Sequence, residues 1–381
     1  MSAPGRPNRE SFEHQREGGP ASHLMVVAAG TGGHVMPGLA VAEALRGRGW
    51  TVSWLGTRSG MERSLVEPRG IAFDAIDFSS LRGKGIGTLL LGGLRLLRAM
   101  WQSRSAIRSR RPVVVFSTGG YVAVPAGLAA SSASVPLALL NADAAPLLST
   151  RLLRSLASAV FCGFDGEAAR VAGARGLVTG NPVRAEIAAL PPPAQRFAGR
   201  DGPLKLLVIG GSLGSQVLNE TVPAALSLLP EQGRPAVAHQ CGGAHAPATR
   251  AAYERAGVTA EVLPFIDDMA GRYGEADVVI CRAGAITITE LAAAGVASLL
   301  VPLVVSTTSH QRSNAEFMAA QGAAVHLPQA ELSAGRLAAV LSDLTRQCLL
   351  EMADRARAIG RPEATRVVAD AIEHIAREAG R

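Results

Sequence analysis

The chain has 381 residues, of which 48% are apolar and 18% charged, and its formal net charge is +7. One hydrophobic core rarely stays compact beyond roughly 250–300 residues, so this length predicts two domains. The dispersed glycines and prolines argue against a low-complexity chain, and the basic balance favours acidic partners such as phosphates or anionic lipid. The four cysteines are far apart and form no CxxC pair, so neither a disulfide framework nor a zinc site is expected.

Short apolar runs alternate along the chain with longer amphipathic runs. Residues 1–22 are polar and lack an apolar signal core, so we expect a disordered leader there. The runs predicted to form buried strands are 24–29, 52–56, 113–117, 137–140, 206–209, 236–239, 278–281 and 299–301. Helical patterns lie between them, for example at 39–46 and 286–294. The alternation predicts an α/β fold of two doubly wound, Rossmann-like domains that face a cleft.

A proline-rich stretch separates two similar halves of the sequence. A predicted strand leads into a glycine-rich loop at 30–33, and the same pattern restarts at 210–214. Between the two lies the stretch LPPPAQ, whose composition suits a linker. The predicted organisation is a first domain at 23–189, a linker at 190–196, a second domain at 197–361 and a closing helix at 362–381.

The first domain contains two small-residue loops, each after a predicted strand. GTGGHVMPG at 30–38 lets the backbone turn sharply, and Pro37 suits the first turn of a helix whose free N–H groups can hold an anion. A dinucleotide-binding turn is disfavoured because Val35 stands where the third glycine of that pattern belongs. His34 stands beside this turn, and its near-neutral pKa suits a general base. The second loop is STGGY at 117–121.

Three motifs of the second domain follow predicted strands in the same way. GGSLGS at 210–215 offers backbone amides and Ser212 to a diphosphate at a helix start. In CRAGAITITE at 281–290, we expect Glu290 in the first turns of a helix. Its carboxylate is able there to accept hydrogen bonds from both hydroxyls of a ribose. The alternative for Glu290 is an acid favoured by the helix dipole. HQRSNA at 310–315 places amides where they suit sugar hydroxyls.

The order of GTGGHVMPG, STGGYVAVP, TGNPVR, GGSLGS, FIDDM, CRAGAITITE and HQRSNA resembles the MurG family over about residues 23–328. The resemblance implies an inverting glycosyltransferase of the GT-B fold. Its donor would be UDP-GlcNAc. Its acceptor would be lipid I, undecaprenyl-pyrophosphoryl-MurNAc-pentapeptide, which receives N-acetylglucosamine on the C4 hydroxyl of MurNAc to give lipid II.

The family's functional positions carry over to particular residues of this chain. Ile266 would contact the uracil through its backbone, and Gln311 would hold hydroxyls of N-acetylglucosamine. Ser212 and Arg184 would lie near the diphosphate, and His34 would deprotonate the acceptor. The cleft would be lined from the first domain by Thr31, Gly32 and Gly33. The nucleotide would be lined by Ala285, Ile286, Thr287, Ile288, Thr289 and Glu290, the last on the ribose. The resemblance implies no metal, no cofactor and no nucleic acid.

One segment departs from the family pattern. The family has His-Glu-Gln-Asn after the strand that ends near Leu139, whereas this chain has Leu140-Asn141-Ala142-Asp143. Asp143 therefore stands where the family has a ligand-contacting asparagine. Either the acceptor differs or the local hydrogen bonds are rearranged.

A basic and apolar stretch predicts a membrane-facing surface. From Arg82 to Arg111 the chain contains basic residues and leucines but no acid, and no segment has the pattern of a transmembrane helix. A solvated helix that covers its own core is the simpler alternative for part of this stretch. We expect peripheral binding to an anionic membrane surface, at the cytoplasmic face of the cell membrane.

Three other functions stay open from the sequence. A related lipid glycosyltransferase, such as a diacylglycerol glycosyltransferase, would share the fold and a basic membrane face. A UDP-GlcNAc 2-epimerase is also built on two such domains, but the GTGGHVMPG loop disfavours it. A non-catalytic UDP-sugar binder is made conceivable by the departure at 140–143.

Overall fold

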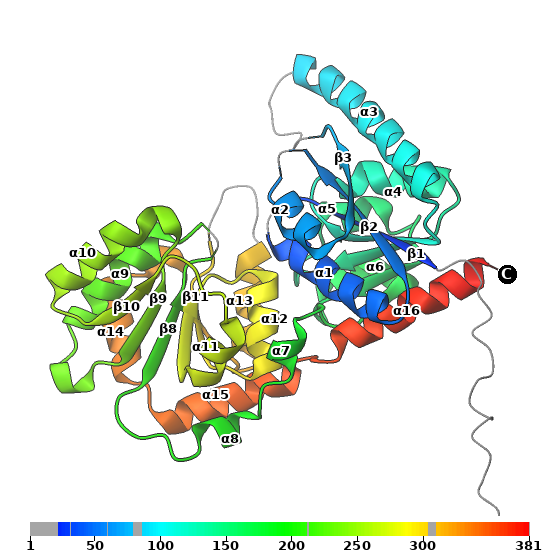
Figure 1. The fold of residues 1–381 in the computed structure, drawn as a ribbon. Coiled ribbons are helices and arrows are strands. Elements are labelled where there is room, and N and C mark those ends of the chain that lie inside the picture. Colours follow the sequence, from blue (N-terminus) through cyan, green and yellow to red (C-terminus); the bar gives the residue numbers. More distant parts are fainter. Residues whose placement is uncertain are drawn as a thin grey trace, which may run out of the picture.

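The computed structural model describes residues 22–30, 32–58, 60–78, 86–211, 213–303 and 310–380. Within these ranges the chain forms two α/β domains, each built on one parallel sheet (Figure 1). Both sheets have helices on both faces, as the alternating sequence pattern predicts.

The first domain contains a seven-stranded sheet in the order β3-β2-β1-β4-β5-β6-β7. Its strands are β1 (His23–Ala28), β2 (Thr51–Thr57), β3 (Ala72–Ile76), β4 (Val114–Gly119), β5 (Leu137–Asn141), β6 (Ala159–Cys162) and β7 (Gly176–Val178). Its helices are α1 (Gly32–Gly47), α2 (Glu62–Val66), α3 (Ile86–Arg110), α4 (Ala123–Ser132), α5 (Leu148–Leu153) and α6 (Glu167–Ala172). Alternate residues of β1 enter two separate cores: Val26 packs with α1, and Val27 packs with α4.

The second domain contains a six-stranded sheet in the order β10-β9-β8-β11-β12-β13. Its strands are β8 (Lys205–Ile209), β9 (Ala236–Gln240), β10 (Ala260–Leu263), β11 (Val278–Cys281), β12 (Ser298–Leu300) and β13 (Val325–His326). Its helices are α9 (Gln216–Ser227), α10 (Ala246–Ala256), α11 (Met269–Glu275), α12 (Ala285–Ala294), α13 (His310–Ala320), α14 (Ala334–Ser342) and α15 (Arg346–Ile359).

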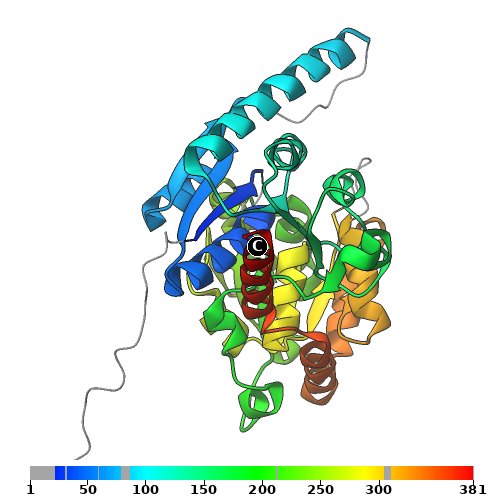
Figure 2. The same cartoon turned by 90° about the vertical axis from the view of Figure 1, so that its right-hand side faces the viewer.

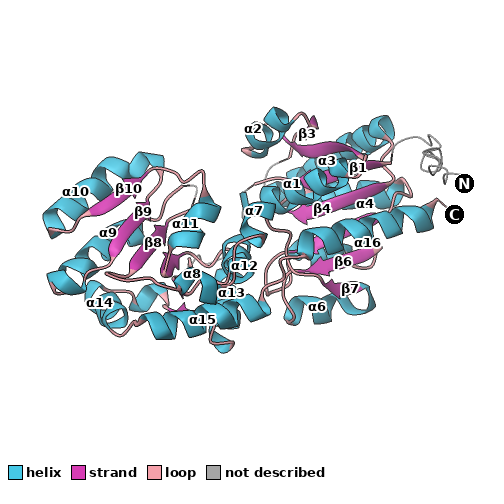
Figure 3. Cartoon of the chain, turned by 60° about the horizontal axis from the view of Figure 1, so that its bottom comes forward, coloured by secondary structure: helices cyan, strands magenta, loops and turns pink. Residues whose placement is uncertain are grey.

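The chain crosses between the domains twice. The first crossing follows β7 and leads through the short helices α7 (Ala185–Ala188) and α8 (Pro193–Phe197) to the second sheet. The second crossing leads from α15 to α16 (Ala364–Ala379). Although α16 is the last helix in the described residues, it packs on the first domain (Figure 3). Its residues Val368 and Ile372 join the core that contains β1 and α1. Figure 2 shows α16 end-on against that domain. The predicted domain limits, including the linker at 190–196, stay a proposal.

The eight predicted strands are all present, each shifted by at most two residues at an end. Five further strands, β3, β6, β7, β10 and β13, were not predicted, and all but β6 are edge strands of a sheet. The placement of Pro37 in the first turn of a helix was wrong, because α1 already begins at Gly32 and Pro37 lies inside it. A proline at this depth removes one backbone donor of the helix. His34 consequently lies within the first turn of α1.

Candidate active site

The loops that follow the carboxyl ends of the strands in both sheets meet between the two domains. Parallel sheets of this kind bind ligands at the carboxyl ends of their strands. On the first-domain side, Gly30 leaves β1 with a φ of 109° and α1 follows directly. The first turn of α1 contains Gly32, Gly33 and His34. Thr31 lies outside the described residues, so its predicted role stays a prediction.

The His34 imidazole is anchored to the loop that follows β4. Its Nδ1 lies 3.1 Å from the carbonyl oxygen of Thr118, and the Thr118 hydroxyl donates to the His34 carbonyl at 2.6 Å. Since a carbonyl only accepts, Nδ1 carries the proton and donates. Nε2 is then the basic nitrogen of the neutral ring. This orientation is the one that a general base needs.

Burial is the largest influence on His34 and lowers its pKa below the ordinary value, and His310 lowers it further. Asp143 and the bond to Thr118 act in the opposite direction and raise the pKa. The net direction is downward, so the imidazole is neutral at pH 7. A neutral ring is ready to accept a proton without first losing one.

The STGGY loop requires glycine at two successive positions. A Cβ on Gly119 would lie 2.8 Å from Nδ1 of His34, and one on Gly120 would lie 2.1 Å from the carbonyl oxygen of Ala29. Both residues also have a positive φ, of 112° and 81°. The two glycines therefore let the β4 loop lie directly against the His34 ring and the end of β1.

Asp143, which follows β5, accepts a hydrogen bond from the second domain. Asn314 of α13 donates to Asp143 Oδ1 at 2.9 Å and to the carbonyl of Ala283 at 3.1 Å. The Asn314 carbonyl oxygen accepts from the Ala144 backbone N–H at 2.9 Å. Asn314 is fully buried, so this amide is a fixed bridge between the domains. The departure at Asp143 thus belongs to an interdomain contact, and its predicted ligand contact stays a prediction.

A pocket of about 730 Å³ opens on the second domain beside the bridge. It is lined by the glycine loop at Gly210 and Gly211, by Gly284 and Thr287 at the start of α12, and by Gln311 of α13. The helices α9 and α12 both begin at this pocket, so their free N–H groups favour an anion there. Ser212 belongs to the same loop but lies outside the described residues.

The predicted run from Ala285 to Glu290 divides among several surroundings. Thr287 lines the 730 Å³ pocket, whereas Ile288 is fully buried in the core of the second domain. Ala285 and Ile286 pack against the core of the first domain. Thr289 accepts a 2.9 Å hydrogen bond from Asn181, which belongs to the GNPVR motif of the first domain. The start of α12 therefore contacts the pocket and the first domain at once.

Glu290 forms an ion pair between the domains. Its Oε1 lies 3.0 Å from the guanidinium of Arg184, and the Tyr273 hydroxyl lies 3.5 Å from Oε2. Burial raises the pKa of Glu290 above its ordinary value, and Arg184 opposes that rise. Neither residue lines the 730 Å³ pocket. Their predicted contacts with ribose and diphosphate are untested.

Two further predicted residues occupy different surroundings. The side chain of Ile266 is buried in a core of the second domain, so only its backbone is left for the predicted contact with the uracil. Gln311 lines the pocket, and its side-chain oxygen accepts from the Leu303 N–H at 2.8 Å. Among the described residues, no group of three or more His, Cys, Asp or Glu side chains lies close enough to hold a metal ion.

Three polar residues that hold the site together were not predicted from the sequence. Asn314 and Asn181 lie inside motifs that were recognised, but nothing in the sequence indicates that they bridge the domains. Glu62 carried no signal at all, yet its buried carboxylate accepts from the Thr57 backbone N–H at 2.8 Å and from the Gly30 N–H at 3.4 Å. It ties the glycine loop after β1 to the end of β2.

The paired parallel-sheet domains and the interdomain site define a glycosyltransferase of the GT-B class. The profile of the glycosyltransferase family 28 N-terminal domain matches residues 24–162, and that of the family 28 C-terminal domain matches residues 205–375. The chain belongs to this family and, within it, to the MurG group.

The assignment to the MurG group rests on relatives with high sequence identity. The UDP-N-acetylglucosamine–N-acetylmuramyl-(pentapeptide) pyrophosphoryl-undecaprenol N-acetylglucosamine transferase of Chromobacterium violaceum is 56% identical over 93% of this chain and 99% of its own. The enzyme of the same name from Herminiimonas arsenicoxydans is 55% identical over 92% and 98%.

Solved structures agree with this placement. The crystal structure of Acinetobacter baumannii MurG superposes with a TM-score of 0.79 at 37% identity, covering 93% of this chain and 99% of that one. A UDP-GlcNAc 2-epimerase from Neisseria meningitidis bound to UDP-GlcNAc has a TM-score of 0.62 at 12% identity, over 93% and 100% of the chains. The likeness to the epimerase shows a shared fold alone.

Proposed function

We propose that the chain transfers N-acetylglucosamine from UDP-GlcNAc to the C4 hydroxyl of the muramyl sugar in a pyrophosphoryl-undecaprenol acceptor that carries a pentapeptide. The observation that carries the proposal is the neutral His34, held with Nε2 as its basic nitrogen on the first-domain side of the site. The names of relatives that are 55% and 56% identical over nearly the whole chain supply the donor and the acceptor.

The proposed reaction is a single displacement at the donor sugar. His34 Nε2 removes the proton of the acceptor hydroxyl while its oxygen bonds to C1 of N-acetylglucosamine. The bond between C1 and the diphosphate oxygen breaks, and the electron pair leaves with UDP. The attack inverts the configuration at C1. Asp143 favours the imidazolium that forms, since it raises the His34 pKa.

The second domain would bind the donor. The helix starts of α9 and α12 and the glycine loop between β8 and α9 favour the negative charge that grows on the leaving diphosphate. Thr287 and Gln311, which line the same pocket, offer polar groups to the nucleotide and the sugar. Glu290 would accept hydrogen bonds from the ribose hydroxyls, and the backbone of Ile266 would contact the uracil.

The long helix α3 is the surface that would meet an anionic membrane. It projects from the first domain (Figure 1), and Leu94, Leu97 and Trp101 are 66%, 58% and 71% exposed. The helix contains arginines and no acid. Arg82 and Lys84 of the predicted surface lie outside the described residues. Within the described part of the chain no helix is long and apolar enough to cross a membrane. The arginines and exposed apolar side chains of α3 support the proposal of peripheral binding, at the cytoplasmic face.

One assay separates this function from the alternatives. Purified protein is incubated with labelled UDP-GlcNAc and a short-chain analogue of the pentapeptide acceptor, with diacylglycerol, or with no acceptor. We expect label only in the muramyl product. Label in diacylglycerol, epimerised donor without acceptor, or binding without turnover would each support another function and overturn the proposal.

A further inference from the structure

A second pocket, of about 410 Å³, lies between the domains and has no role in the chemistry above. The first domain contributes Phe164 and Asp165 after β6 and Gly180 after β7. The second domain contributes α12, α13 and the end of α15, up to Arg361 in the crossing to α16. Both chain crossings therefore line this space.

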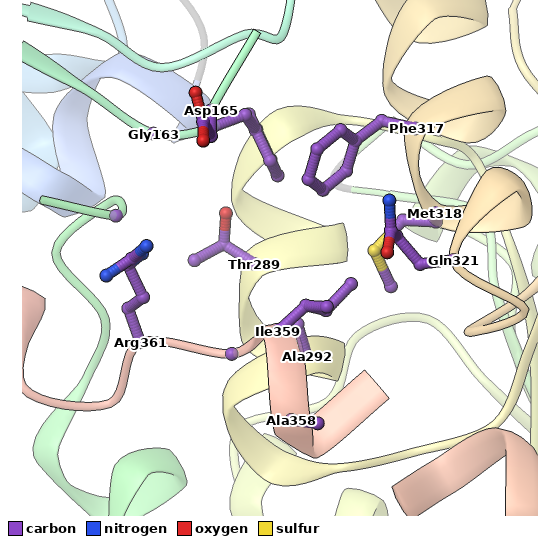
Figure 4. A pocket seen from close by; sticks show the side chains of 13 residues that line it. Gly163, Asp165, Thr289, Ala292, Phe317, Met318, Gln321, Ala358, Ile359 and Arg361 are labelled. Atoms are coloured by element: carbon purple, nitrogen blue, oxygen red, sulfur yellow. The ribbon is translucent and has the colours of Figure 1, made fainter. Parts of the chain in front are cut away.

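The lining combines an apolar wall with groups of both charges. Phe164 and Phe317 pack edge to face across the domain interface with ring centroids 5.0 Å apart, and Met318 extends this wall. In Figure 4, Asp165 and Arg361 lie on one side of the space, whereas Phe317, Met318 and Gln321 lie on the other. Asp165 and Arg361 are both exposed to solvent.

The base of the Arg361 side chain packs closely against the first crossing, which places this residue at the rim of the pocket. A Cβ on Gly180 would lie 2.7 Å from Cβ of Arg361, and Gly180 has a φ of 79°. Only glycine at position 180 therefore allows the second crossing to lie directly against the first. A guanidinium is able to form two parallel hydrogen bonds with a carboxylate.

We propose that this pocket binds the carboxyl-terminal part of the acceptor's peptide, with the terminal carboxylate on Arg361 and the peptide amides on Asp165 and Gln321. The inference rests on the proposed function, because it takes its acceptor from there. A peptide displays N–H donors, carbonyl acceptors, side chains and one terminal charge, which is the mixture that this lining complements.

The sheet order makes the distance suitable. His34 follows β1, whereas Asp165 follows β6, and these strands are separated by β4 and β5. Neighbouring strands lie about 4.8 Å apart, so three spacings cover roughly 14 Å. Five extended residues span about 17 Å, so an extended pentapeptide is long enough to cover this distance.

The point at which the peptide is attached to the sugar explains why its carboxyl end is the part that reaches the 410 Å³ pocket. Muramic acid carries its carboxyl-bearing ether on C3, next to the reacting C4 hydroxyl, and the peptide is joined to that carboxyl through its amino end. Its own carboxyl end is therefore the part farthest from His34. The loop after β5 is held by Asn314 and follows the strand that lies between β4 and β6. The peptide would therefore pass over the outside of this loop, and only its last residues would reach the pocket.

The test compares two acceptors in three proteins. The acceptors carry the full pentapeptide or a tripeptide that lacks the last two residues. The proteins are the parent, Arg361→Gln, and Arg377→Gln as a control on the exposed face of α16. We expect Arg361→Gln to raise KM for the pentapeptide acceptor by about 10- to 100-fold, the usual effect of losing a charged hydrogen-bond partner, with kcat little changed. The tripeptide acceptor should be used equally by all three proteins.

Other outcomes are distinguishable. An equal loss on both acceptors, or no loss on either, would overturn the proposal. Free pentapeptide that alters tripeptide turnover in the parent but not in Arg361→Gln, with no preference between acceptors, would assign the pocket to a free ligand and would also overturn it. Absence of transfer to both acceptors in the parent would instead contradict the proposed function.

Discussion

The carboxylate of Glu290 lies 3.0 Å from the guanidinium of Arg184, so an ion pair joins the middle of α12 in the second domain to the first chain crossing. Glu290 is 6% exposed, and burial alone would disfavour its charge. Arg184 offsets that cost. A ribose that binds Glu290 therefore has to share the carboxylate with Arg184 or displace it.

Replacement of Glu290 by alanine should affect both binding and stability. We expect UDP affinity to fall by about 10- to 100-fold, since hydrogen bonds to a charged group contribute roughly 1.5–3 kcal/mol. The parent should prefer UDP over 2′-deoxy-UDP, and Glu290→Ala should bind both almost equally. Calorimetric titration of both nucleotides measures this. An unchanged preference together with a lower melting temperature would leave Glu290 as a structural partner of Arg184 only.

Replacement of His34 by alanine should lower turnover without weakening UDP binding. General-base catalysis typically contributes about 10²–10⁴-fold, and we expect a loss in that range. UDP affinity should stay within about threefold, because the proposed nucleotide pocket belongs to the second domain. Steady-state kinetics and calorimetry on the same preparation check both parts. A fall in turnover of less than tenfold would exclude His34 as the base.

Asp143→Asn separates the charge of Asp143 from its hydrogen bond. An asparagine oxygen still accepts from Asn314, so the bridge should persist and plateau turnover should be retained. Asp143 raises the pKa of His34, so removal of its charge should lower that pKa further. The acid limb of kcat/KM should then move to lower pH, because the base stays neutral there. Collapse of activity at all pH values would show instead that Asp143 acts directly on the acceptor.

The membrane surface should depend on both arginines and apolar side chains of α3. We expect co-sedimentation with anionic vesicles that weakens as salt is raised, and little binding to neutral vesicles. Trp101→Ser should weaken binding, whereas Trp50→Phe at a half-buried position outside α3 serves as the control. Equal binding to both kinds of vesicle would contradict an electrostatic contribution.

The fold class was predictable because the central strands of parallel sheets are continuous apolar runs. β8, with the sequence KLLVI, is an example, and glycine-rich loops mark where such strands end. The edge strands β3 and β7 were missed, because AFDAI and GLV are too polar or too short to stand out. The motifs located most of the site. The pairing of Glu290 with Arg184, 106 residues apart, was not predictable, because spacing within a motif carries no information on how two domains approach.

The chemical structure of the product tests the proposed transfer reaction most directly. Purified protein is supplied with UDP-GlcNAc and a short-chain, lipid-linked muramyl-pentapeptide, and the isolated product is analysed by NMR. We expect a disaccharide with a new bond from C1 of N-acetylglucosamine to O4 of the muramyl sugar, inverted at C1 relative to the donor, and one UDP released per bond formed. Retained configuration, a bond to another hydroxyl, or UDP release without a disaccharide would contradict the proposed reaction.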